Sequence, residues 1–228
     1  MGDQTTYLGV GLYSYADAAR IIGIAPAKLR RWVRDYEYFT HGFRRHHQPV
    51  IPRYLDQEER VLTFLELIEL LFVALFRREG VSLQAIRLAA ERAARLFATN
   101  YPFAVRRFST DGKRIFATLK DEAGSPELMA ELGRGQLVFP TVIQPYLRKI
   151  EYHGDDTALK FWPMERKGRV VLDPERAFGE PIDAETGVPT IVLYKAVQAE
   201  GGEQAITDVE ERAGDATGPM GREHQAGQ

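Results

Sequence analysis

An almost unbroken apolar stretch, VLTFLELIELLFVALF, occupies residues 61–76, where thirteen of the sixteen residues are apolar. A helix that spans a bilayer needs about 20 consecutive apolar residues, and this stretch is shorter and contains Glu66 and Glu69. Because it is apolar on nearly every side of a helix, it has to be buried against several neighbours. We therefore predict a long core helix that begins at an Asp56 cap, with Glu59 three residues later.

The rest of the composition is that of an ordinary globular chain. The 228 residues are 44% hydrophobic and 27% charged, which suffices for one large domain or two small ones. There is no cysteine, so disulfides, thiolate metal sites and cysteine nucleophiles are excluded. The N-terminus shows no basic segment followed by an apolar one, so we expect no secretory signal and a cytoplasmic protein.

The formal net charge of −2 conceals a charge asymmetry along the chain. Residues 26–55 hold seven Lys or Arg against two acids, which gives +5. Residues 199–228 hold two Arg against seven acids, which gives −5. A basic front suits an anionic partner, and an acidic end with few large apolar residues is typical of a disordered tail.

Two short helices are predicted in the basic front. Ser14 with an acid three residues later caps the first helix, which stops at Gly23. Pro26 begins the second helix, which extends to about Tyr36 and buries one stripe of side chains, Leu29, Trp32 and Val33. Two helices in this order, with the basic one second, predict a helix-turn-helix whose second helix fits the major groove of DNA.

We expect double-stranded operator DNA as a partner. Arginine suits bidentate contact with guanine or phosphate, and a following loop or hairpin would lie on the backbone as a wing. The candidate DNA-binding residues are Lys28, Arg30, Arg31, Arg34, Arg44, Arg45 and Arg53. The alternative is a plain helical hairpin with a solvated basic face.

The remaining chain predicts a mainly α fold with small β hairpins, in which an N-terminal winged helix-turn-helix precedes a C-terminal α+β domain. The expected elements are a helix over 82–97, a hairpin over 103–119 turning at Asp111-Gly112, helices over 126–132 and 140–152, strands over 159–162 and 169–172, a turn-rich loop over 178–190 and a helix over 191–199.

The segment YSYADAARIIGIAPAKLRRWVRDY, at residues 13–36, resembles the start of MerR-type winged-helix regulators. VSLQAIRLA at 81–89 resembles a later segment of the same family, and Arg53-Tyr54 falls near the Arg-x-Tyr of its wing. The chain differs in having Ala25 where a Ser usually caps the second helix, and in a longer wing. The resemblance implies that Arg30 and Arg53 contact phosphate and that Lys28 and Arg31 lie near the groove.

The segment KGRVVLDPERAFGEPIDAETGVPTIVLYKAVQAEGG, at residues 167–202, resembles the small domain of VapB-type antitoxins. The combined resemblance implies a type II antitoxin that represses its own operon and neutralises a PIN-type ribonuclease toxin. It divides the chain into a head, a connecting region, an antitoxin-type domain and a tail, at 12–98, 99–162, 163–200 and 201–228. The region beyond Val170 would face the toxin, and Arg212 or Arg222 could enter the toxin's acidic metal site.

The sequence gives little support for a metal site or a catalytic site. His41, His46 and His47 match no zinc spacing, so we expect solvated or phosphate-facing histidines and no metal. Without a nucleophile–base set or a phosphate loop, we expect no enzyme and no cofactor.

The apolar stretch at residues 61–76 needs more cover than one helix supplies, which predicts a homodimer. Two alternatives stay open: a MerR-like regulator with a small-molecule pocket in residues 100–170, and a scaffold that does not bind DNA.

Overall fold

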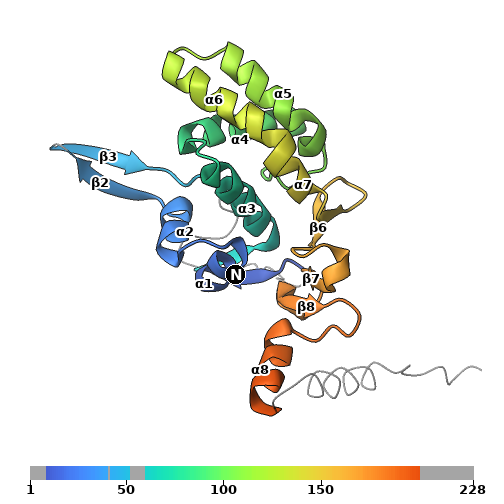
Figure 1. Ribbon diagram of the computed structural model, residues 1–228. Coiled ribbons are helices and arrows are strands. Elements are labelled where there is room, and N and C mark those ends of the chain that lie inside the picture. Colours follow the sequence, from blue (N-terminus) through green and yellow to red (C-terminus); the bar gives the residue numbers. More distant parts are fainter. Residues whose placement is uncertain (1–8, 41, 52–59, 201–228) are drawn as a thin grey trace, which may run out of the picture.

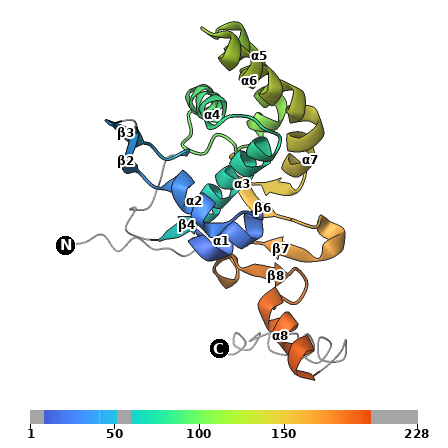
Figure 2. The same cartoon turned by 60° about the vertical axis from the view of Figure 1, so that its left-hand side comes forward.

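The computed structural model describes residues 9–40, 42–51 and 60–200. They form a mainly helical molecule with three small antiparallel sheets, as expected (Figure 1). The long helix α3 lies at the centre, with the helix-turn-helix on one side and a four-stranded sheet on the other (Figure 2). In these three ranges no helix is long and apolar enough to cross a membrane.

The N-terminal part begins as the caps predict. Its elements are β1 (Leu12–Ser14), α1 (Tyr15–Ile22), α2 (Pro26–Val33), β2 (Tyr36–Thr40), β3 (Phe43–His47) and β4 (Val61–Thr63). The Ser14 hydroxyl accepts from the N–H of Asp17, and Gly23 ends α1 at φ +76°. Helix α2 ends earlier than expected because the backbone is already extended at Arg34. The predicted loop or hairpin is the β2–β3 hairpin, while β1 pairs with β4.

The core helix α3 (Phe64–Arg78) begins later than the sequence predicts. Strand pairing with β1 takes residues 61–63, so Thr63 is the N-cap and exchanges hydrogen bonds with Glu66 at 3.2 and 2.8 Å. The expected cap at Asp56, with Glu59, lies outside the described residues. Burial on several sides is confirmed, because twelve of the fifteen residues of α3 are buried.

The α-helical layer beyond α3 contains one clear error of prediction. Helix α4 (Leu83–Phe97) is as expected, but residues 107–121 form helix α5 (Arg107–Asp121) where we predicted a hairpin. Gly112 lies inside α5, where a Cβ would sit 2.3 Å from the Phe139 ring. Gly112 therefore allows the two helical segments to pack closely and does not form a turn. Helix α6 (Pro126–Val138) is longer than predicted and packs antiparallel to α5.

The C-terminal part is built on the sheet β5–β6–β7–β8. Its elements are η1 (Phe139–Ile143), α7 (Gln144–Leu147), β5 (Ile150–Tyr152), β6 (Ala158–Phe161), η2 (Arg166–Gly168), β7 (Val170–Leu172), η3 (Ala177–Gly179), β8 (Pro181–Asp183) and α8 (Thr190–Glu200). The predicted helix over 140–152 thus ends at Leu147, since residues 150–152 pair in the sheet. The predicted strands match β6 and β7, and the predicted loop contains β8. The sheet draws strands from both sides of the predicted boundary after residue 162.

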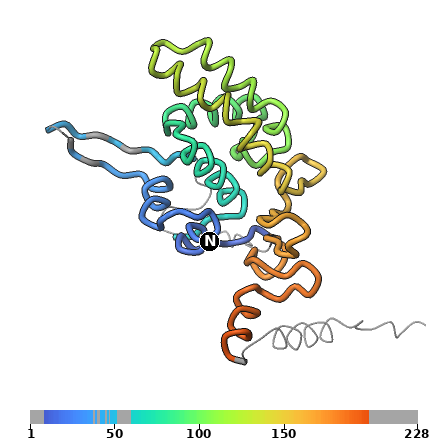
Figure 3. The backbone as a smooth tube through the Cα atoms, viewed as in Figure 1, coloured from blue at the N-terminus to red at the C-terminus, as the bar shows by residue number. Residues whose placement is uncertain are grey.

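A buried hydrogen bond joins the N-terminal strand to the C-terminal part. The Tyr13 hydroxyl, on β1, donates to the Gly179 carbonyl of η3 at 2.6 Å. Gly179 has φ +87°, and a Cβ there would lie 2.5 Å from the Tyr13 oxygen. The trace in Figure 3 shows the N-terminal strand running to the C-terminal sheet. The helix-turn-helix is therefore fixed to the C-terminal part as well as to α3.

Two carboxyl groups of α3, Glu66 and Glu69, are fully buried, and Glu69 lies against the start of the segment that follows α4. One of its oxygens accepts from the N–H groups of Phe103 and Ala104 at 2.6 and 2.9 Å, and the other has no partner. Burial raises the pKa of Glu69 to about 8 despite these two hydrogen bonds. The group therefore holds the chain after α4 against α3 chiefly as a neutral acid.

Replacing Glu69 should change how stability depends on pH. Because the folded pKa lies above the unfolded value of 4.5, the folded state binds the proton more tightly. The free energy of unfolding should then fall by up to roughly 1.4 kcal/mol per pH unit from about pH 5 to about pH 8. Urea denaturation of Glu69→Gln should lose this slope, since an amide has no such proton. The exposed control Glu127→Gln should keep it, and parallel curves for all three proteins would contradict the assignment.

Adding one methyl group at Gly112 should test the corrected helix. Ala at a free helical position gains about 0.5–1 kcal/mol over Gly, but here the Cβ meets Phe139. We expect Gly112→Ala to destabilise by about 1–3 kcal/mol in thermal or urea unfolding. Gly133→Ala, where the nearest atom is a flexible Lys120 carbon at 3.6 Å, should be neutral or stabilising. Equal effects at the two sites would contradict the close packing of Phe139 against Gly112.

Candidate nucleic-acid interface

The turn between α1 and α2 fixes how the second helix is presented. At Gly23 the N–H donates to the Ala19 carbonyl at 2.9 Å, and the N–H of Ile24 donates to the same oxygen at 2.9 Å. Pro26 opens α2 without losing a hydrogen bond, because the first N–H groups of a helix have no partner inside it. As expected, the chain forms a helix-turn-helix with a basic second helix.

The exposed side of α2 is positively charged. Leu29, Trp32 and Val33 are buried, which turns the remaining positions outward. Arg30, Arg31 and Arg34 are exposed, while Lys28 is half-buried. Its ammonium lies 5.1 Å from the centre of the Trp32 ring. This cation–π contact restrains Lys28, whereas Arg31 extends from the side opposite the core.

Three arginines meet in a cavity of about 350 Å³ at the start of both helices. Arg30 reaches it from α2, Arg34 from the residue after α2 and Arg60 from the residue before β4. Ser14, the first residues of α1 and Pro26 complete the lining. Helix N-termini carry partial positive charge and attract anions. The nearby Asp17 is already paired with Arg20 at 2.6 Å. The arrangement suits a phosphate group.

Arg60 was missed by the sequence analysis. Residues 56–60 hold three acids, and the expected helix from Asp56 would have carried Arg60 within it. Pairing of β4 with β1 brings Arg60 to the N-terminus of α1. Arg60 becomes a candidate only through this long-range pairing, because no pattern of neighbouring residues pointed to it.

The β2–β3 hairpin projects from the body as the wing (Figure 1). Its base is fixed by two hydrogen bonds, from the Val50 N–H to the Trp32 carbonyl at 2.8 Å and from Arg87 to the Gln48 carbonyl at 2.8 Å. The aromatic residues Phe39 and Phe43 near its tip are 75% and 69% exposed.

The wing's charges are partly paired with one another. Arg44 contacts Glu37, and His46 contacts Asp35 at 2.5 Å. Such exposed pairs are worth at most about 1 kcal/mol, so a phosphate could replace the acid. Arg45 lies on β3 opposite Tyr38. Three further predicted contact residues, Arg53, Arg212 and Arg222, lie outside the described residues. In the described parts of the chain no three His, Cys, Asp or Glu side chains cluster to hold a metal.

The C-terminal part has its own polar centre at the turn after β8. Asp183 is buried and accepts from Arg169 at 2.9 Å and from the N–H of Thr186 at 2.9 Å. Burial alone would raise the pKa of Asp183, but the hydrogen bonds from Thr186 and Arg169 hold it below its usual value. This turn leads into α8, where Ile191, Val192 and Tyr194 are exposed.

Comparison with known proteins agrees with this architecture. Residues 11–90 match a family described as "Putative DNA-binding HTH domain". The Mycobacterium tuberculosis protein named "Putative antitoxin VapB45" is 28% identical over 221 residues, which cover 91% of this chain and 92% of that protein. "Uncharacterized protein Rv2308" of the same organism is 26% identical, over 88% of this chain and 83% of its own length.

The fold is also similar to a solved one. The crystal structure of Rv2018 from Mycobacterium tuberculosis matches with a TM-score of 0.70 and 23% identity, covering 92% of this chain and 98% of the other. At this identity the likeness concerns the fold. The chain thus has an N-terminal helix-turn-helix DNA-binding domain, and over nearly its whole length it is similar to a protein named as an antitoxin.

The three-arginine cavity can be tested by DNA binding. Arg60→Ala, and Arg30→Ala combined with Arg31→Ala, should each weaken binding to DNA from upstream of the gene by about 1–3 kcal/mol per lost contact. Because each phosphate contact releases counterions, the slope of log affinity against log salt should become shallower by about 1 per contact. Fluorescence anisotropy across a salt series measures both. Arg114→Ala on α5 should leave both unchanged, and an unaltered Arg60 variant would remove that residue from the interface.

Proposed function

We propose that this protein is the DNA-binding antitoxin of a type II toxin–antitoxin pair, of the VapB type with a MerR-like winged head. It represses its own operon, neutralises a PIN-type ribonuclease toxin, and acts by binding and not by catalysis. The observation that carries the proposal is the near-complete coverage by a relative named as an antitoxin, together with a head whose exposed helix and cavity are basic.

In this proposal α2 enters the major groove. Arg31 is directed at the groove, while Arg30, Arg34 and Arg60 hold a backbone phosphate at the N-termini of the two helices. The wing lies on the neighbouring phosphates through Arg44 and Arg45. These roles differ in kind, because groove contacts set the sequence preference and phosphate contacts set the affinity and its salt dependence.

The proposed homodimer would match a two-fold operator with half-sites about 34 Å apart. Its interface has to lie away from α3, because α3 is already covered by elements of its own chain. The need to cover the apolar stretch is therefore no longer an argument for a dimer. Support comes instead from the symmetry that helix-turn-helix proteins commonly share with their operators.

The toxin would bind the C-terminal part. Three apolar side chains of α8, Ile191, Val192 and Tyr194, are 46%, 42% and 60% exposed, and apolar groups on one exposed helix are typical of an interaction surface. The tail beyond residue 200 adds two arginines among six acids. Arg212 or Arg222 would occupy the toxin's acidic metal site, and the tail's acids would meet a basic rim.

Co-expression with the product of the adjacent gene tests this assignment. Deleting residues 201–228 should leave operator binding intact and reduce rescue of growth from the toxin. If the shortened chain still protects fully, replacing Ile191 and Tyr194 by Ser should abolish both protection and pull-down of the toxin. A matched control, Leu137→Ser, changes an exposed apolar side chain on α6 and should protect normally. Full protection by every variant would contradict a toxin contact in this part.

A second candidate function is a MerR-like regulator that responds to a small molecule. It is favoured by a cavity of about 380 Å³ that the connecting region forms with the helix-turn-helix head. The two candidates differ in what the neighbouring gene encodes: a toxic ribonuclease favours the antitoxin, and its absence favours the regulator.

A further inference from the structure

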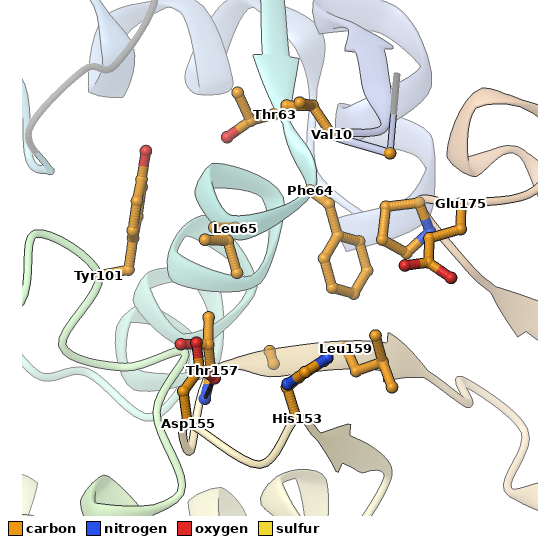
Figure 4. Close-up of a pocket in the computed structure, with 13 residues that line it drawn as sticks. Val10, Thr63, Phe64, Leu65, Tyr101, His153, Asp155, Thr157, Leu159 and Glu175 are labelled. Carbon is orange, nitrogen blue, oxygen red and sulfur yellow. Dashed lines mark hydrogen bonds between the residues drawn. The ribbon is translucent and has the colours of Figure 1, made fainter. Parts of the chain in front are cut away.

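The cavity of about 380 Å³ lies between the head and the C-terminal sheet. Its walls come from the start of α3, the β5–β6 hairpin and the turn after β7 (Figure 4). Figure 4 shows Phe64 and Leu65 facing His153, Thr157 and Leu159, with Tyr101 on one side and Glu175 on the other. Its volume falls within the range of about 300–1,000 Å³ found for small-molecule sites.

The cavity has an apolar lining and an acidic rim. Phe64, Leu65 and Leu159 supply apolar surface. Two carboxylates, Asp155 and Glu175, lie at its rim and are exposed, and no Lys or Arg is among the described residues that line it. The Thr157 N–H donates to Asp155 at 3.0 Å, and the hydrogen bonds with Thr157, together with the nearby His153 that also lines the cavity, hold the pKa of Asp155 below its usual value. Asp155 is therefore an anion at neutral pH.

The start of α3 does not offset this acidic character. A helix N-terminus usually favours anions, but here the Glu66 carboxylate accepts from the Thr63 N–H at 2.8 Å. The Phe64 N–H donates to the Val10 carbonyl at 3.2 Å. The Thr63 and Phe64 N–H donors at the start of α3 are thus already in use.

We propose that this cavity binds a small organic cation, an amine with an apolar or aromatic body. The body packs on Phe64 and Leu159, and the ammonium group lies at the rim, beside either Asp155 or Glu175, which Figure 4 shows on opposite sides of the cavity. The same rim repels carboxylates and phosphates, which separates this site from the arginine-lined DNA interface. A bound amine contacts the head and the C-terminal sheet together, so it holds them in one arrangement. The inference does not depend on the proposed antitoxin function.

Three probes of similar shape test the charge preference on the full-length protein: 2-phenylethylamine, 2-phenylethanol and 3-phenylpropanoate. Isothermal titration at low salt should give the tightest binding for the amine, weaker binding for the alcohol by about fivefold or more, and none for the carboxylate. The preference should shrink as salt is added, because exposed charges are screened. The melting temperature of the protein should rise most with the amine, less with the alcohol and not at all with the carboxylate.

The double variant Asp155→Asn, Glu175→Gln should bind the amine and the alcohol equally, and retained alcohol binding shows that the cavity is intact. Asn at 155 can still accept from the Thr157 N–H. The matched double variant Asp121→Asn, Glu127→Gln removes two acids near the α5–α6 turn and should keep the preference. Equal binding of the carboxylate, a preference that survives in the first double variant, or no amine binding up to about 10 mM would overturn the proposal.

Discussion

Helix α3 is apolar on almost every side, and the positions of its neighbours follow from the need to cover it. Helix α1, the β1–β4 pair, α4 and η1 all pack against it. The rings of Phe103 and Phe116 pack against Phe76 in tilted arrangements, at centroid distances of 6.1 and 5.1 Å. The helix-turn-helix is therefore presented from a rigid base, which a DNA-reading helix needs because its contacts depend on position.

The head and the C-terminal part are joined more closely than the resemblances alone suggest. The Tyr13 hydroxyl bonds the Gly179 carbonyl, and Gly11 has Pro174 at 3.1 Å from where its Cβ would be. The buried Asp173 pairs with Lys160 at 2.8 Å. Burial raises the pKa of Tyr13, and the negative charge of Asp173 raises it further. These contacts fix the position of the head relative to the C-terminal sheet.

Local signals in the sequence predicted the elements that local interactions determine. The Ser14 cap, the Gly23 stop, the Pro26 start and α4 are of this kind, because each depends on residues within one turn of the helix. The errors occur where distant residues decide. Asp111-Gly112 is a favoured turn by itself, yet Phe139 packs against Gly112 and selects a helix. In the same way, pairing with β1 moved the start of α3 to Phe64 and brought Arg60 into the candidate site.

The candidate DNA surface has two kinds of arginine: those that share a cavity with one another, and those that are paired with an acid. Lys28 is restrained on Trp32. Arg30 and Arg34 share a cavity with Arg60, so these three cations are gathered before any anion arrives. Gathering like charges is unfavourable in the free protein and becomes favourable when a phosphate enters. On the wing, by contrast, Arg44 is held by Glu37, and a phosphate must displace that carboxylate. The cavity should therefore contribute more affinity per arginine than the wing, which would chiefly orient the head on the duplex.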